Sequence, residues 1–162
     1  RTGAPLETCD LVGLRTSRVI SSRTPSGPNV AADGVHRFRV RPMRGWLKLG
    51  APGYSETWSP EVRLDAGGTA SLAVALEPLG RLVVIVVDDA GAPLKEGTLL
   101  VLGRDFEQAI GVKDGVADAR LDAGERVVTV DVDRMPGYEP FELPIVIRPG
   151  EQTNARLQVA RR

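Results

Sequence analysis

The chain has 162 residues, with 21 basic and 21 acidic side chains and a pI near 6.8. Zero net charge gives no overall attraction to nucleic acid, and no apolar run is long enough for a transmembrane helix, so membrane insertion is not expected. A hydrophobic fraction of 42% argues against disorder. The single cysteine, Cys9, excludes an internal disulfide and a cysteine-based metal cluster, and we expect a small core residue there.

Three short motifs occur twice, in the same order and at nearly the same spacing. They are Gly3-Ala4-Pro5-Leu6 and residues 91–94, Asp33-Gly34-Val35 and residues 114–116, and Pro52-Gly53-Tyr54 and residues 136–138. Such a repeat indicates two copies of one unit. We therefore predict two domains, 1–78 and 79–162, which meet at Glu77-Pro78-Leu79-Gly80.

In the first copy, apolar and polar residues alternate between turn residues, which is typical of strands. A loop is expected at 21–32, followed by a strand at Val35–Val40 with Phe38 and Val40 inward. The next strand has Leu47 and Leu49 inward, and Trp58 is expected in the core with Val62 and Leu64. The strand that precedes the Gly-Ala-Pro-Leu motif in the second copy is missing here, so the chain begins inside a domain or the first copy borrows a strand from elsewhere.

The second copy predicts seven strands. They are expected at 82–87, 98–102, 109–112, 116–121, 126–133, 141–147 and 152–159. The unbroken apolar run Leu82–Val87 predicts a strand buried on both faces, and Asp114-Gly115 predicts a hairpin turn. Val128, Val130 and Val132 are expected to point inward. The predicted fold class is all-β: two tandem seven-stranded β-sandwiches of prealbumin-like or Ig-like type, the first lacking its initial strand.

The order of these motifs is similar to that of the carboxypeptidase regulatory-like domain, also called transthyretin-like or prealbumin-like. The resemblance rests on a Val/Ile strand, a Gly-x-Pro-Leu turn, an Asp-Gly hairpin, a Gly-Tyr pair and a final Gly turn. In the second copy these are Leu82–Val87, Gly91, Pro93-Leu94, Asp114-Gly115, Gly137-Tyr138 and Pro149-Gly150. The resemblance implies an accessory module with a carbohydrate-binding-like fold on secreted or cell-surface proteins.

Residues that would support catalysis are scarce. His36 is the only histidine, so a zinc carboxypeptidase site, which needs two, cannot be assembled, and a serine- or cysteine-based triad would have to use His36 as its base. We expect His36 to be a packed or rim residue. The acidic pair Asp88-Asp89 should cap its own turn, whereas Asp131 and Asp133 should face solvent. The expectation is therefore a non-enzymatic protein with no catalytic residue, no metal site and no cofactor.

One outward face is unusual in its composition. If Leu47 and Leu49 point inward, Trp46 and Lys48 point outward, and Arg37, Arg39 and Arg41 should join them from the preceding strand, with Arg44 at the turn. The matching face of the second copy is acidic. Either this is a solvated face that happens to be rich in arginine, or it is a contact surface for an acidic glycan or a neighbouring domain. The candidate contact residues are Arg37, Arg39, Arg41, Arg44, Trp46 and Lys48.

These observations favour a non-catalytic accessory or structural module of a larger exported bacterial protein, which mediates spacing or protein interaction. The alternative is a carbohydrate-binding module that uses the exposed Trp/Arg face. The expected partners are neighbouring domains of the same polypeptide or a glycan, and the resemblance implies an extracellular, periplasmic or cell-surface location. The sequence contains no feature that identifies a particular ligand.

Overall fold

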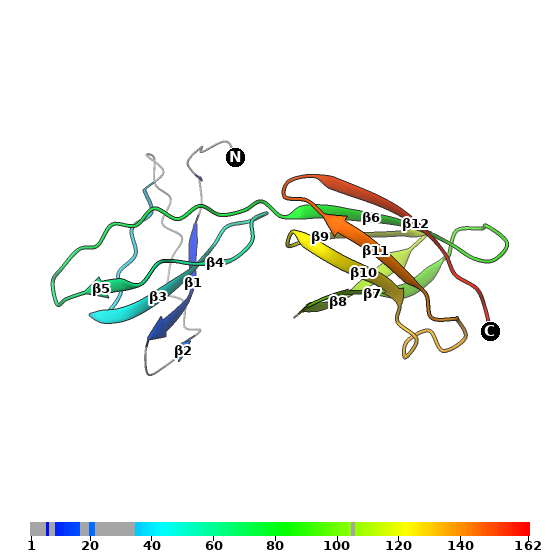
Figure 1. Cartoon of the computed structure of the whole chain (residues 1–162), viewed down its shortest axis with the longest axis horizontal. Coiled ribbons are helices and arrows are strands. Elements are labelled where there is room, and N and C mark those ends of the chain that lie inside the picture. Colours follow the sequence, from blue (N-terminus) through cyan, green and yellow to red (C-terminus); the bar gives the residue numbers. More distant parts are fainter. Residues whose placement is uncertain (1–5, 7–8, 17–19, 22–34, 105) are drawn as a thin grey trace. The chain divides into compact units, whose positions relative to one another are not determined.

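The computed structural model describes residues 6, 9–16, 20–21, 35–104 and 106–162 (Figure 1). The described residues form strands and connecting turns and contain no helix, so the all-β prediction is confirmed. The chain divides into two compact units, Arg1–Glu77 and Pro78–Arg162. The predicted turn at Gly3-Ala4-Pro5 and nearly all of the predicted loop at 21–32 lie outside the described residues.

The second unit has seven strands. They are β6 (Gly80–Val87), β7 (Glu96–Gly103), β8 (Phe106–Lys113), β9 (Val116–Leu121), β10 (Gly124–Val130), β11 (Glu142–Ile147) and β12 (Gln152–Gln158). Their order is β11-β10-β7-β8-β9-β6-β12, and β8 and β9 share a single residue pair beside their hairpin. The sheet therefore consists of two layers, β11-β10-β7-β8 and β9-β6-β12.

The hairpin between β8 and β9 forms as the sequence predicts. Asp114 and Gly115 both have positive φ, 49° and 79°, which is the backbone of a type I′ turn. Gly115 also needs to lack a side chain, because a Cβ there would approach Pro93. The turn fixes the point at which the chain passes from one layer to the other.

Between the layers lies an aliphatic core of 16 buried residues. Leu82, Val84 and Val86 of β6 are 0% exposed and lie at its centre. Strand β6 is central in its layer, antiparallel to β9 and parallel to β12. Its burial on both faces was wrongly predicted, because Ile85 is 43% exposed.

Strand β10 ends at Val130, earlier than predicted. The carbonyl of Asp131 accepts hydrogen bonds from the N–H groups of Arg134 and Met135, and its carboxylate accepts a third from Arg134. Asp131 is thus buried as a turn cap, which corrects its expected exposure, and Val132 is exposed where an inward position was expected. The predicted alternation fails here because a turn has no strand period.

The described residues of the first unit form five strands in one sheet. They are β1 (Asp10–Thr16), β2 (Ile20–Ser21), β3 (Met43–Gly50), β4 (Thr57–Trp58) and β5 (Val62–Leu64). The order is β2-β1-β3-β4, and β5 also pairs with β3. One face of this sheet carries a small buried cluster of Cys9, Leu11, Leu47, Leu49 and Val62. The expected core position of Cys9 is confirmed.

Residues 35–41 are not a strand, which corrects the predicted strand Val35–Val40. They nevertheless alternate in burial, since Phe38 and Val40 pack against the cluster whereas Arg39 and Arg41 are exposed. Residues 73–76 behave in the same way, with Val74 and Leu76 against the cluster and Ala73 and Ala75 exposed. The first unit therefore has a hydrogen-bonded layer faced by two extended segments, and two complete seven-stranded sandwiches are not what the structure shows.

Candidate binding face on the first unit

The candidate site lies on the outer face of β3. Leu47 and Leu49 are buried as predicted, so the alternation of the strand directs Arg44, Trp46 and Lys48 to the opposite side. Arg15 of β1 stands directly opposite Trp46. Its guanidinium lies 5.9 Å from the centre of the Trp46 ring, within the range of a cation–π contact, and Trp46 is half-buried.

A second tryptophan belongs to the same face, and sequence reasoning missed it. Trp58 of β4 pairs with Lys48, so it lies on the Lys48 side of the sheet, diagonal to Trp46. It is 41% exposed, which makes its predicted core position wrong. We call Arg15, Arg44, Trp46, Lys48 and Trp58 together the Trp face.

The side of the sheet to which Trp58 points was predicted wrongly because the strand is interrupted. Ser59 is buried and its hydroxyl accepts a hydrogen bond from the Leu47 N–H, while Pro60 follows it with no N–H of its own. Residues 59–61 therefore shift the inward and outward alternation between β4 and β5. Pro60 inside an alternating stretch was the signal that could have revealed this break.

Charges on the Trp face are balanced by acidic neighbours. Arg44 donates two hydrogen bonds to the carboxylate of Glu61, at 3.1 and 3.2 Å, and this pairing raises the pKa of Arg44. Lys48 forms an ion pair with Glu56. The strongly basic face expected from the sequence is corrected accordingly, because two of its cations are paired with carboxylates from the segment that follows β3.

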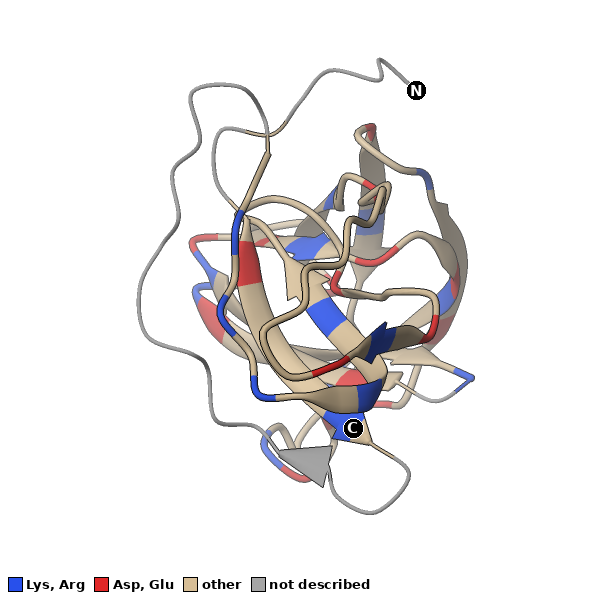
Figure 2. Ribbon diagram, turned by 90° about the vertical axis from the view of Figure 1, so that its left-hand side faces the viewer, with Lys and Arg blue, Asp and Glu red and all other residues tan. Residues whose placement is uncertain are grey.

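The remaining predicted residues occupy a different place. Arg37, Arg39 and Arg41 alternate with Phe38 and Val40, which cover the cluster on the inner side of β3. Because Trp46 is on the outer side of β3, the structure does not bring these three arginines into the Trp face. Figure 2 shows basic positions along the coil that leads from the grey segment into a strand. His36 is half-buried there, with Nε2 2.9 Å from the Leu6 carbonyl oxygen.

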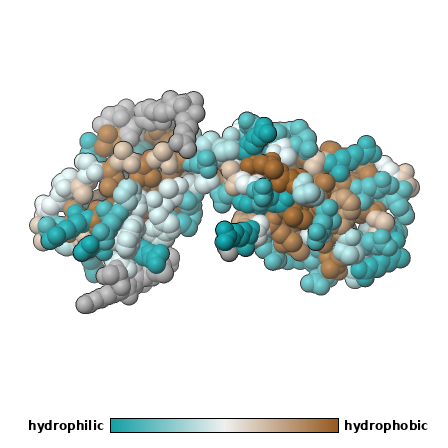
Figure 3. All heavy atoms as spheres, in the orientation of Figure 1, coloured by the Kyte–Doolittle hydropathy of each residue, from teal (hydrophilic) through white to brown (hydrophobic). Residues whose placement is uncertain are grey.

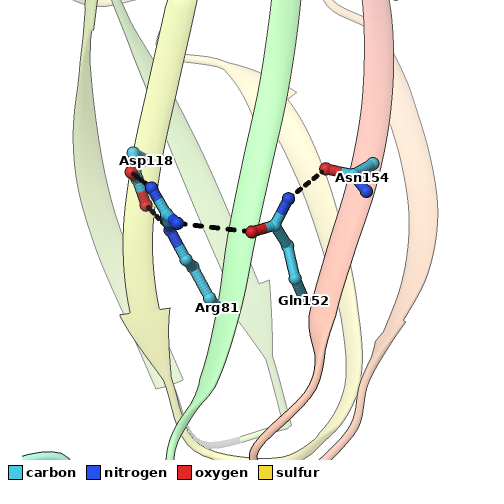
Figure 4. Close-up of polar contacts among 4 residues, drawn as sticks. All are labelled: Arg81, Asp118, Gln152 and Asn154. Carbon is cyan, nitrogen blue, oxygen red and sulfur yellow. Dashed lines mark hydrogen bonds and ion pairs between the residues drawn. The ribbon is translucent and has the colours of Figure 1, made fainter.

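The second unit does not carry the acidic counterpart that the sequence suggested. Asp118 of β9 accepts two hydrogen bonds from Arg81 of β6, which also donates to Gln152 of β12, and Gln152 donates in turn to Asn154 (Figure 4). The hydrogen bonds from Arg81 hold the pKa of Asp118 below its ordinary value. With Asp118 paired and Asp131 buried, this face is not a free acidic surface.

A shallow hollow lies on the surface of the second unit. It has a volume of about 620 Å³ and lies over β7, β10 and β11, where Leu102, Val127, Pro144 and Val146 line it. Figure 3 shows hydrophobic residues among hydrophilic ones on the visible face of this unit. Arg126 also lines the hollow, but its guanidinium lies 5.2 Å from the Phe106 ring and binds backbone carbonyls. No converging set of catalytic groups is built there by the described residues.

Within the described ranges, no group of three or more His, Cys, Asp or Glu side chains could hold a metal ion. None of the described segments is a helix long and apolar enough to cross a membrane.

Asp88 caps its own turn as expected, since its carboxylate accepts a hydrogen bond from the Ala92 N–H.

No family model matches the chain, and no curated protein gives a significant match. Among solved structures, the Bacillus anthracis TIE protein is similar at 16% identity and a TM-score of 0.46, over 74% of this chain and 24% of that one. A DUF3823 family protein from Bacteroides ovatus is similar at 13% identity and a TM-score of 0.39, over 49% of this chain and 44% of that one. The minor pilin of Streptococcus agalactiae is similar at 14% identity and a TM-score of 0.41, over 86% of this chain and 67% of that one. The chain spans less than half of the first two proteins, and no functional conclusion rests on these likenesses.

Proposed function

We propose that the protein is a non-catalytic accessory module of a larger exported bacterial protein, in which it sets spacing or mediates protein contacts. The observation that carries this proposal is the construction of the second unit. Its interior is filled by aliphatic side chains, and charged residues such as Arg81 and Asp118 pair across neighbouring strands. A domain built in this way is suited to holding neighbouring domains of the same protein at fixed positions.

The resemblance to carboxypeptidase regulatory-like domains supports the same role. We propose that residues 1–78 and 79–162 are two modules on one β-sandwich plan, and that they act outside the cytoplasm, at the cell surface or in the periplasm. Their partners would be neighbouring domains of the same polypeptide. Turnover of a peptide, ester or glycoside substrate by the purified chain would contradict the non-catalytic role.

A second candidate function, carbohydrate binding, is favoured by the Trp face. Two tryptophans on neighbouring strands, one of them 41% exposed, offer flat apolar surfaces of the kind on which sugar rings stack. Arg15 adds a charged donor beside Trp46. The ion pairs of Arg44 and Lys48 leave the face close to neutral, so a neutral or weakly acidic glycan fits better than a highly charged one.

A glycan array with matched variants tests this candidate. Trp58→Ala should lower the retention of any bound glycan about tenfold, the effect of losing one stacking contact of about 1–1.5 kcal/mol. Phe141→Ala is the control, because Phe141 is the repeat counterpart of Trp58 and is equally exposed at 41%. Equal loss in both variants would contradict the Trp face as the site, and retention of no glycan by the wild type would leave the spacing role alone.

A further inference from the structure

Strand β8 of the second unit forms one edge of its layer. It pairs with β7 over all eight of its residues, without a bulge (Figure 1). On its other side only Lys113 pairs with β9, at Val116, because the two strands diverge after their hairpin. Among the described residues, 106–112 therefore have no strand beside them on that side. We call residues 106–112 the free edge of β8.

The free edge carries unpaired backbone groups at alternate residues. Lys113 pairs with Val116 across a two-residue turn, so its N–H and C=O point toward β9. The next residue agrees with this direction, since the Asp114 N–H donates to the Lys95 carbonyl on the β7 side. By alternation along the strand, every second residue before Lys113 also directs its N–H and C=O away from β7. These residues are Glu107, Ala109 and Gly111.

The free edge lacks two features by which proteins commonly keep a sheet edge from pairing, a proline and a bulge. The opposite edge of the same layer is β11, which contains Pro144, and the Thr153 hydroxyl donates to the Val146 carbonyl there. On β8, by contrast, the exposed side chains in the middle of the edge are only those of Ala109 and Gly111. A regular edge with such small side chains is a template for another strand.

Gly111 has no structural reason within the second unit itself. Its φ is not positive, and a Cβ at this position would meet no described atom within 4 Å. Glycine weakens the interior of a strand, and it often marks a place where another backbone approaches closely. The position of Gly111 on the free edge is therefore a second indication that a strand binds there.

The charges of β8 identify a second copy of the chain as the occupant. The midpoint of the free edge is Ala109, so an antiparallel pair with a two-fold axis at Ala109 places Glu107 opposite Gly111 of the other copy. Lys113 is then diagonal to Glu107 of the other copy, within reach of its long side chain, and the symmetry repeats this contact. Neither side chain forms an ion pair or hydrogen bond with a described residue in the single chain.

We propose that the free edge of β8 pairs with the same edge of a second copy, antiparallel and about a two-fold axis at Ala109. Ala109 pairs with Ala109, and Glu107 pairs with Gly111 in both directions, so that all the free N–H and C=O groups of these residues become hydrogen-bonded. The layer β11-β10-β7-β8 then continues into the same layer of the second copy. Because a single pair of strands is a small interface, the dimer should be weak. The inference goes beyond the proposed function and does not involve the Trp face.

Sedimentation of the full chain between about 1 µM and about 1 mM, the range in which weak complexes dissociate, tests the pairing. The average mass should rise from the 17.3 kDa of one chain toward twice that value. Residue-resolved hydrogen exchange should show that the Ala109 and Gly111 amides become protected as the dimer forms, whereas the Ile110 amide is already protected by β7 in the monomer. A chain that is still monomeric at about 1 mM would overturn the proposal.

Reversing the charges of β8 tests the register. Glu107→Lys and Lys113→Glu change exposed side chains, so the circular dichroism spectrum should not change, but each should weaken the dimer about fivefold by placing like charges together. The variant with both changes should regain the affinity of the wild type. An equimolar mixture of the two single variants should form a heterodimer more readily than either variant pairs with itself, because each contact then joins lysine to glutamate.

Two further variants separate this edge from general effects of charge and of proline. Glu125→Lys makes the same charge change at an exposed position of β10 and should leave the dimer unchanged. Ala109→Pro removes an N–H that points away from β7, so it should prevent the dimer while the unit remains folded. Equal weakening by Glu107→Lys and Glu125→Lys, a double charge variant no more dimeric than the single ones, or a dimer that persists in folded Ala109→Pro would each overturn the proposal. If Ala109→Pro does not fold, the charge variants decide the question alone.

Discussion

Asp118 shows how a single surface carboxylate makes stability depend on pH. Its pKa is lowered in the folded state by the hydrogen bonds from Arg81, so its stabilisation is present above the unfolded pKa of about 3.9 and is lost as pH falls through the folded value. Asp118→Asn should therefore lower the melting temperature of the second unit at pH 7, and this difference should shrink as the pH falls below about 3.9. Thermal melts across this range check the prediction, with Asp133→Asn as an exposed control.

Both side chains of this pair are about half-exposed, so added salt should reduce the difference between Asp118→Asn and the wild type. A difference that is as large at pH 2 as at pH 7 would contradict the electrostatic explanation. It would indicate that the aspartate contributes by packing alone.

Single-residue predictions from the sequence succeeded where the strand is regular. Leu47 and Leu49 alternate with Trp46 and Lys48 as expected, because β3 is unbroken over this stretch. Trp58 was misplaced because Ser59 and Pro60 interrupt its strand. The charge of the Trp face was predicted wrongly as well. Glu56 and Glu61 reach Lys48 and Arg44 because the segment after β3 folds back onto this strand, and the local pattern of β3 alone does not show this.

At the scale of elements, β6 has two unequal faces, and a pair of substitutions measures the difference. Leu82→Ala should lower the free energy of unfolding by about 2–5 kcal/mol, because Leu82 is 0% exposed in the core. Ile85→Ala on the same strand should cost less than about 1 kcal/mol, since its side chain is partly in water. Urea unfolding of both variants checks the pair, and equal losses would restore the prediction of burial on both faces.

Strand positions in the second unit were predictable because turn residues bound them. The bounds of β9 match the prediction at both ends, and Asp114-Gly115 specifies its turn through positive φ. The segment 35–41 has the same alternation as β9 but is not a strand. Alternation describes which side chains face a core, whereas a strand also needs a neighbour to pair with, and β6 provides that neighbour only in the second unit.

For the whole molecule, the two units differ in how much core the described residues give them. The buried cluster of the second unit has 16 residues, and that of the first has five. Since buried apolar area is the main favourable contribution to folding, the second unit should be the more stable. That the chain consists of two domains, 1–78 and 79–162, each with its own stability, remains a prediction that unfolding experiments can test.

One buried sulfur atom in each unit makes this comparison direct. Cys9 is the sole cysteine of the chain, and burial, with the charge of Asp10 as a smaller cause, raises its pKa, so the folded first unit should react slowly with an alkylating reagent. Met135 is buried in the core of the second unit, where it should resist peroxide until that unit opens. In separate samples with rising urea, we expect Cys9 to become alkylated at a lower concentration than Met135 becomes oxidised. Mass spectrometry measures both midpoints, and a coincident midpoint would mean that the two units unfold together, while earlier oxidation of Met135 would reverse the predicted order of stability.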